Sequence, residues 1–190
     1  MPRIFDNIEK QLLPALTETL KVAERADFCV GYFNLRGWRH LVDHVDRWAG
    51  GDGQCCRLLV GMHVLPSEEL RQALRGGDDE ELLDNQTALR EKRRIAEEFR
   101  QQMTFGIPSN ADEATLRHLA SQIHAKKLVV KVYLRHPLHA KLYLLHRQDV
   151  NNPVTGFLGS SNLTQAGLSK QGELNVDVLE HDACNKLVAW

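Results

Sequence analysis

Two short polar stretches in the last third of the chain carry residue types that could act on a phosphate ester. HAK places a histidine and a lysine two positions apart, at His139 and Lys141, and GSSNLT follows at residues 159–164. Histidine can act as a nucleophile or an acid near neutral pH, lysine holds negative charge, and serine and asparagine donate hydrogen bonds. Phosphodiester cleavage needs a nucleophile, an acid for the leaving alkoxide and donors for the non-bridging oxygens.

The apolar residues around HAK predict a strand over 140–147 that positions the histidine and the lysine. Side chains of a strand alternate between its two faces. One face then carries His139, Lys141 and Tyr143, and the core face carries Leu138, Ala140, Leu142 and Leu144. A second predicted strand over 155–161 puts on one side Leu158, Ser160 and Asn162. The polar groups converge if the two strands are neighbours, although an H-x-K pair on a strand also arises by chance.

Together, HAK, GSSNLT and GELNV at residues 172–176 resemble the phospholipase D superfamily, whose signature is H-x-K-x4-D followed by G-S-x-N. The resemblance is closest to phospholipase D-like nuclease domains, including those at the N-terminus of bacterial helicase-like proteins. It is strongest over residues 128–180. ADFCVGYF before RGW is similar to the first strand and turn of such domains, which extends the match over most of the chain.

The resemblance implies a role for each matching residue. His139 would be the nucleophile that forms a phosphohistidine or, in a partner copy, the general acid. Lys141 and Asn162 would bind the phosphate oxygens, with Ser160 hydrogen-bonding in the same pocket. Glu173 would orient the histidine ring, or it is a surface charge at a strand end. The chemistry implied needs no metal and no cofactor.

The chain departs from the superfamily pattern in two ways. His146 stands where the pattern has Asp, which makes the positioning of the catalytic ring less certain. Only one H-x-K followed by G-S-x-N is present, whereas the superfamily uses two copies across a pseudo-twofold axis. A homodimer is the economical way to assemble the full site, because twofold dimers are the commonest oligomers.

Charge is distributed unevenly although the formal net charge is only -1. Residues 114–148 contain no Asp or Glu but five of the nine histidines, together with Arg117, Lys126, Lys127, Lys131, Arg135, Lys141 and Arg147. A local excess of positive charge suits a polyanionic partner such as nucleic acid. The alternative is a solvated basic face, since these charges need not converge in space.

Hydrophobic patterns predict an α/β fold with a mixed sheet flanked by helices on both faces. Helices are predicted over 14–25 and 38–49. A helical pattern starts at residue 67, breaks at 75–79 and resumes over 80–103. A further helix is predicted over 110–125, with a capping box of Asn110 and Glu113. Strands are predicted over 27–35, 55–62, 128–134, 140–147, 155–161 and 174–180, before a final helix from residue 182. The late, closely spaced strands favour a mixed sheet over a helix bundle.

Composition sets the broad class of protein. The chain has 190 residues, 43% of them apolar and 26% charged, which predicts a single folded domain spanning residues 1–190. It has no apolar run long enough to cross a membrane and no signal-peptide pattern, which favours a cytoplasmic protein. Reduced core cysteines, without a disulfide or structural metal, are expected at Cys29, Cys55, Cys56 and Cys184.

These observations lead to one principal expectation about function and one alternative. The principal one is a metal-independent phosphodiesterase, a hydrolase acting as a nuclease on DNA or RNA, with DNA favoured, and with its site completed by homodimerisation. The alternative is a non-catalytic module that binds nucleic acid or mediates dimerisation in a helicase-like protein. In either case the chain is expected to be the N-terminal part of a longer protein with a helicase-like region downstream, and no membrane partner is expected.

Overall fold

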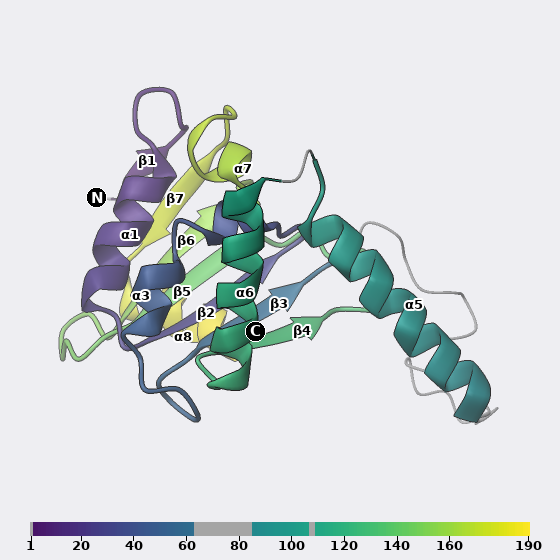
Figure 1. Ribbon diagram of the computed structural model, residues 1–190. Helices are drawn as coiled ribbons and strands as arrows, with labels where there is room; N and C mark the ends of the chain where they lie inside the picture. Colours follow the sequence, from purple (N-terminus) through teal and green to yellow (C-terminus); the bar gives the residue numbers. More distant parts are fainter. Residues whose placement is uncertain (1, 63–84, 107–108) are drawn as a thin grey trace.

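A mixed β-sheet runs through the protein in the computed structural model, which describes residues 2–62, 85–106 and 109–190. Within these residues the sheet has seven strands in the order β1-β7-β6-β5-β2-β3-β4 (Figure 1). They are β1 (Ile4–Phe5), β2 (Arg25–Val30), β3 (Cys56–Val60), β4 (Leu128–Val132), β5 (Leu142–His146), β6 (Val154–Gly159) and β7 (Asn175–Val178). β2, β3 and β4 are parallel, and every pairing from β2 through β5, β6 and β7 to β1 is antiparallel. The predicted α/β class with a mixed sheet is confirmed.

Helices cover both faces of this sheet. They are α1 (Leu12–Val22), α2 (Leu35–Trp38), α3 (Val42–Asp46), α5 (Asn85–Met103), α6 (Asn110–His124), α7 (Gln165–Ser169) and α8 (His181–Ala189). Figure 1 shows α1, α3 and α6 in front of the sheet, and α5 extending away from it. The other face carries α8, whose Cys184 and Leu187 pack with residues of β2 and β5.

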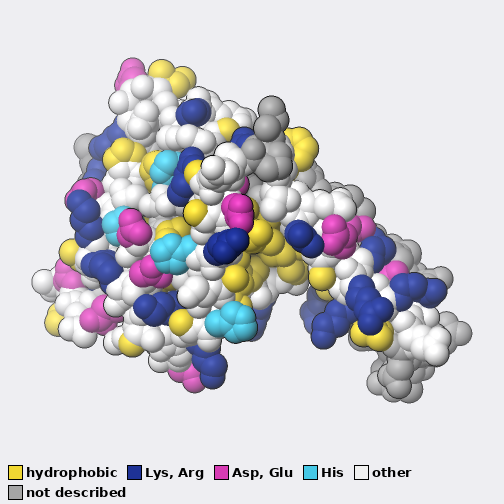
Figure 2. Space-filling model, viewed as in Figure 1, with side chains coloured by type: hydrophobic (Ala, Val, Ile, Leu, Met, Phe, Trp, Pro, Cys, Tyr) yellow, Lys and Arg dark blue, Asp and Glu magenta, His cyan; other side chains and the backbone are white. Residues whose placement is uncertain are grey.

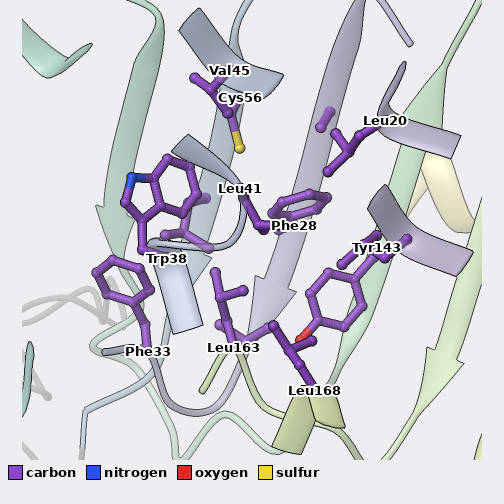
Figure 3. Close-up of a cluster of buried hydrophobic side chains, with 14 of the residues drawn as sticks. Leu20, Phe28, Phe33, Trp38, Leu41, Val45, Cys56, Tyr143, Leu163 and Leu168 are labelled. Atoms are coloured by element: carbon purple, nitrogen blue, oxygen red, sulfur yellow. The ribbon is translucent and has the colours of Figure 1, made fainter. Parts of the chain in front are cut away.

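Alternation along the strands divides the apolar side chains between two cores. In β2, Ala26, Phe28 and Val30 enter the larger core beneath α1, α2, α3 and α6, whereas Cys29 enters the smaller core beneath α8. Phe28 meets Tyr143 of β5 edge to face, with the ring centroids 5.1 Å apart (Figure 3). Such aromatic pairs add about 0.5–1.5 kcal/mol beyond area burial. All four cysteines are buried and unpaired.

Several predicted boundaries differ from the structure. The helix predicted over 38–49 is two short helices, α2 and α3, and the strand predicted over 27–35 ends at Val30. The capping box at Asn110 is wrong by one residue, because the Ser109 hydroxyl accepts from the Asp112 amide at 3.2 Å. The helix expected from residue 67, its break and residues 80–84 lie outside the described residues. No described helix is long and apolar enough to cross a membrane.

Candidate active site

The HAK segment lies at the end of the sheet where β2 and β6 finish and β5 begins. His139 is exposed and precedes β5, and no described residue makes a hydrogen bond to its imidazole. Lys141 directly precedes the strand, and its ammonium donates to the His139 carbonyl at 2.8 Å. The Lys141 carbonyl accepts from the Gly159 amide at 3.1 Å, so the pairing of β5 with β6 places HAK beside GSSN.

Ser160 and Glu173 are brought together by the pairing of β6 with β7. The Ser160 hydroxyl donates to the Glu173 carboxylate and accepts from the Leu174 amide at 2.9 Å. Within the described residues, no hydrogen bond joins Glu173 to His139. In this arrangement the carboxylate therefore holds Ser160 directly, and its predicted orientation of the histidine ring stays a prediction.

Asn162 is held against the end of β2. Its side-chain oxygen accepts from the Tyr32 amide at 2.9 Å. A Cβ placed on Gly31 would lie 3.4 Å from this oxygen and 2.6 Å from the Leu138 carbonyl oxygen. The amide of Asn162 and the chain leading into His139 therefore flank the same glycine, which has no room for a larger residue.

This crowding gives a stability prediction. Gly31→Ala is expected to lower the free energy of unfolding by about 1–3 kcal/mol, because the added carbon overlaps the Leu138 carbonyl and forces the backbone apart. Gly172→Ala is the matched control, since a Cβ there meets nothing nearer than 3.9 Å. Urea unfolding of the three proteins checks this. Equal urea midpoints for the two variants would contradict the prediction, because they would show that the backbone at Gly31 moves to accept a Cβ without a loss of stability.

Two residues that the sequence interpretation did not single out support the GSSN loop from below. The Tyr143 hydroxyl donates to the Ser161 carbonyl at 2.9 Å, and the fully buried Ser161 hydroxyl donates to the Gly167 carbonyl at 2.7 Å. Burial raises the pKa of Tyr143 far above its ordinary value, which keeps the hydroxyl protonated as a donor. Figure 3 shows the ring within the core beside Leu163 and Leu168. The sequence signal for Tyr143 was its position two residues after Lys141, which puts both side chains on the same face of a strand.

Neither motif lies inside a strand, contrary to the strand interpretation. β5 begins at Leu142, after HAK, and β6 ends at Gly159, before the serines and the asparagine. The polar side chains therefore project from strand ends and loops. Loops at the ends of strands leave room for a substrate, whereas the face of a continuous strand is covered by neighbouring elements.

A groove with a volume of about 460 Å³ opens beside Asn162 and Glu173. Its walls come from the chain after β2, from α2, from the end of α5 and from α7. They carry two cations, Arg36 and Lys170, and the single carboxylate of Glu173, which already binds Ser160. The described part of the site thus has a polar groove with two cations on one side.

The basic residues of the 114–148 segment do not form one patch. Arg117 pairs with Glu113 on α6, Lys127 donates to the Asp46 carbonyl, and Arg147 lies 3.5 Å from Asp149. Figure 2 shows basic and acidic side chains interspersed on the face that carries α1, α3 and α6. These three charges fit the alternative of a solvated face, and Lys141 is the basic residue of the segment that lies at the site.

Comparison with known families decides the relationship of the chain. The model of the family described as "Cardiolipin synthase, PLD-like domain" matches residues 16–190. The chain belongs to the phospholipase D-like family. This confirms the resemblance seen in the sequence and supports phosphodiesterase-type chemistry in broad terms. A search of curated protein sequences gives no significant match.

Solved structures share the phospholipase D-like fold. The phospholipase D family member Nuc from Salmonella typhimurium is 13% identical, with a TM-score of 0.53 over 100% of this chain and 90% of its own. NucT from Helicobacter pylori is 9% identical, with a TM-score of 0.53 over 100% of this chain and 91% of its own. At these identities the likeness concerns the fold.

His146 occupies the family's aspartate position at the far end of β5 from the site. Four residues separate it from Leu142, about 14 Å along a strand. Its Nε2 lies 2.8 Å from the carboxylate of Asp27 on β2, and the Arg25 guanidinium lies 3.1 Å from the same ring nitrogen. The departure from the phospholipase D-like motif therefore affects an ion cluster between strands, and the geometry around His139 does not depend on it directly.

Across residues 2–62, 85–106 and 109–190, no group of three or more His, Cys, Asp or Glu side chains lies close enough to hold a metal ion. The ammonium of Lys141 contacts the His139 carbonyl, and the pairing of β5 with β6 places the segment that carries Ser160 and Asn162 beside HAK.

Proposed function

We propose that this phospholipase D-like domain is a phosphodiesterase that cleaves nucleic acid through a phosphohistidine intermediate on His139. The observation that carries the proposal is the meeting of HAK, GSSN and Glu173 at one edge of the sheet, joined by the contacts between Lys141 and Gly159 and between Ser160 and Glu173. Family membership supports the same class of chemistry.

The proposed reaction proceeds in two displacements. A neutral ring nitrogen of His139 attacks phosphorus, the bond to one ester oxygen breaks, and the departing alkoxide takes a proton from the His139 of the partner subunit. Water then attacks the phosphorus atom of the intermediate and gives its proton to the same partner histidine. The phosphorus-nitrogen bond breaks, which regenerates His139 and releases a phosphomonoester. Lys141 and Asn162 bind the non-bridging oxygens, which gain negative charge in each transition state. These donors neutralise that charge without a metal.

The proposed homodimer follows from the single motif and has support from the surface around it. Leu158 is 39% exposed and Leu174 is 65% exposed, and both adjoin the site: Leu158 precedes Gly159, and the Leu174 carbonyl accepts from the Ser160 amide at 3.1 Å. Apolar side chains beside a polar site suit burial against a second copy. In an isologous dimer each copy contributes the same edge, so two His139 side chains can face one phosphate.

Subunit exchange tests the dimer. Wild-type protein is equilibrated with a tenfold excess of His139→Ala, and the cleavage rate at saturating substrate is measured per wild-type chain. A site that needs two His139 side chains predicts a roughly tenfold fall, because nearly every wild-type chain is then paired with an inactive one. An unchanged rate would mean that one chain suffices. His124→Ala, which alters an exposed histidine at the end of α6, is expected to leave the rate undiminished.

Nucleic acid is the proposed substrate, DNA before RNA, because the cationic groove beside Asn162 suits a chain of phosphates. Fluorescent single-stranded DNA, duplex DNA and RNA are incubated with the protein in excess EDTA. Cleavage that resists EDTA supports the proposal, and cleavage that requires added metal contradicts it. Binding of these probes without cleavage would instead identify a non-catalytic nucleic-acid-binding module.

A further inference from the structure

The groove beside the site contains an exposed aromatic ring that the phosphodiesterase chemistry does not use. Phe105 follows α5, lines the groove and is 76% exposed, although most large aromatic side chains of this chain are buried in the core. An apolar ring held in water loses free energy that burial would recover. Its position in a polar groove points to a ligand with a flat apolar face.

The groove wall next to Phe105 is fixed by ionic and backbone contacts. The Arg36 guanidinium lies 3.6 Å from the Asp112 carboxylate at the start of α6. It also lies against the backbone of Gly106, where a Cβ would come within 3.0 Å of the guanidinium. Arg36 is therefore held beside the residue that follows Phe105, which places a cation and an aromatic ring together.

The part of the lining that comes from α7 and the residues after it supplies a second cation and neutral donors. Lys170, at the C-terminal cap of α7, is exposed and has no ion-pair partner within the described residues. Gln165 and Gln171 belong to the same part of the lining. The groove then leads to Asn162, which the proposed function assigns to phosphate binding. Two cations and an aromatic ring in one groove are the groups that bind the phosphates and the bases of a nucleic-acid strand.

We propose that this groove binds single-stranded nucleic acid, with a base stacked on Phe105 and backbone phosphates bound by Arg36 and Lys170. This inference rests on the proposed function and specifies the form of its substrate. A duplex keeps its base faces stacked inside the helix, whereas a single strand can turn one base onto the ring. Both DNA and RNA offer this phosphate and base chemistry. The groove therefore discriminates single strands from duplexes and does not distinguish DNA from RNA.

Binding is measured by fluorescence anisotropy on the intact chain carrying His139→Ala, which prevents loss of the probes. The probes are single-stranded 12-mers of DNA and RNA, a DNA hairpin duplex, and a 12-mer in which abasic sites replace the bases. Phe105→Ala is expected to weaken single-strand binding by about 5- to 150-fold and to leave the hairpin and abasic probes unchanged. Phe105→Trp is expected to restore single-strand binding.

Trp190→Ala is the matched control, because that aromatic side chain is 73% exposed but lies away from the groove. It is expected to leave all four affinities within twofold of the parent. Lys170→Gln is expected to reduce the salt dependence of single-strand binding, as loss of one phosphate contact predicts, by about 0.7 in the logarithmic slope. Circular dichroism of each variant checks that it is folded.

The outcomes separate this inference from the proposed function. Equal losses for Phe105→Ala on the single strand, the hairpin and the abasic probe would overturn the stacking contact, as would an effect no larger than that of Trp190→Ala. If the stacking contact is overturned in this way, EDTA-resistant cleavage by the wild type under the same conditions would still support the proposed phosphodiesterase activity. Phe105-dependent binding without any cleavage would support the groove and contradict the proposed chemistry.

Discussion

Replacement of His139 by alanine is expected to lower the rate of phosphodiester cleavage at least about 10³-fold. The substitution removes both the atom that bonds to phosphorus and, in a dimer, the acid for the leaving group. Lys141 and Asn162 remain, and the imidazole makes no described hydrogen bond whose loss would disturb the fold. The effect should therefore fall on the chemical step, with substrate affinity retained within a few fold.

Single-turnover cleavage of a fluorescent 12-mer in EDTA measures this step, and anisotropy with the same probe measures affinity. His124→Ala is the control for general loss of a histidine and is expected to match the wild type within twofold. A His139→Ala rate within tenfold of the wild type would assign the nucleophile to another residue.

Replacement of Asp27 by asparagine is expected to destabilise the protein by about 2–4 kcal/mol near neutral pH. Asp27 has a side chain only 16% exposed and forms ion pairs with Arg25 at 3.4 Å and with Arg57, besides its contact with His146. Asparagine would leave two guanidinium groups close together without their counter-charge. The cost is below that of a fully buried cluster because Arg57 is 55% exposed.

The pH dependence of this effect follows from the pKa of Asp27. Burial raises that pKa, but hydrogen bonds from His146 and Arg57 and the charge of Arg25 lower it more, so it lies below its ordinary value. A carboxylate with a lowered pKa stabilises the fold above its unfolded pKa of about 4, and this contribution disappears as pH falls through the folded value. The stability difference between wild type and Asp27→Asn should therefore shrink as pH falls from about 4 into stronger acid.

Urea unfolding at several pH values provides the measurement. Asp182→Asn is the control, because it breaks an exposed pair with Lys186 and is expected to change stability by less than about 0.5 kcal/mol. A stability difference for Asp27→Asn that grew as pH fell below about 4 would contradict the assignment. Its cleavage activity should persist while the protein is folded, since the cluster lies at the other end of β5 from His139.

The fold was predictable where local patterns decide the structure. Short apolar runs bounded by glycine or polar residues located β2, β3 and the four later strands, and helical spacing located α1 and α6. β1 was not predicted, because its two residues, Ile4 and Phe5, pair with the distant strand β7. Arg3, just before them, binds the buried Asp177 of β7 at 2.5 Å. α7 was missed because it is a single short helix whose cap, Thr164, belongs to the motif itself.

The site was predictable as a set of residue types and less so as an arrangement. The motif supplied the five proposed site residues, but strand alternation could not show that their polar side chains lie beyond the strand ends. Their proximity depends on β5 pairing with β6, which no local pattern specifies. The groove was unpredictable for the same reason, since Arg36, Phe105 and Lys170 come from segments far apart in the sequence. The role of His146 required knowledge that Asp27 lies on the neighbouring strand.

The proposed covalent step can be observed directly. The protein is mixed with an oligonucleotide carrying ³²P at its internal phosphates, in EDTA, and quenched with denaturant and alkali within milliseconds to seconds. The account predicts label on the protein that resists alkali, is released by acid as expected for a phosphorus-nitrogen bond, and maps to the peptide containing His139. Active cleavage with no such label, or label that persists in His139→Ala, would contradict it.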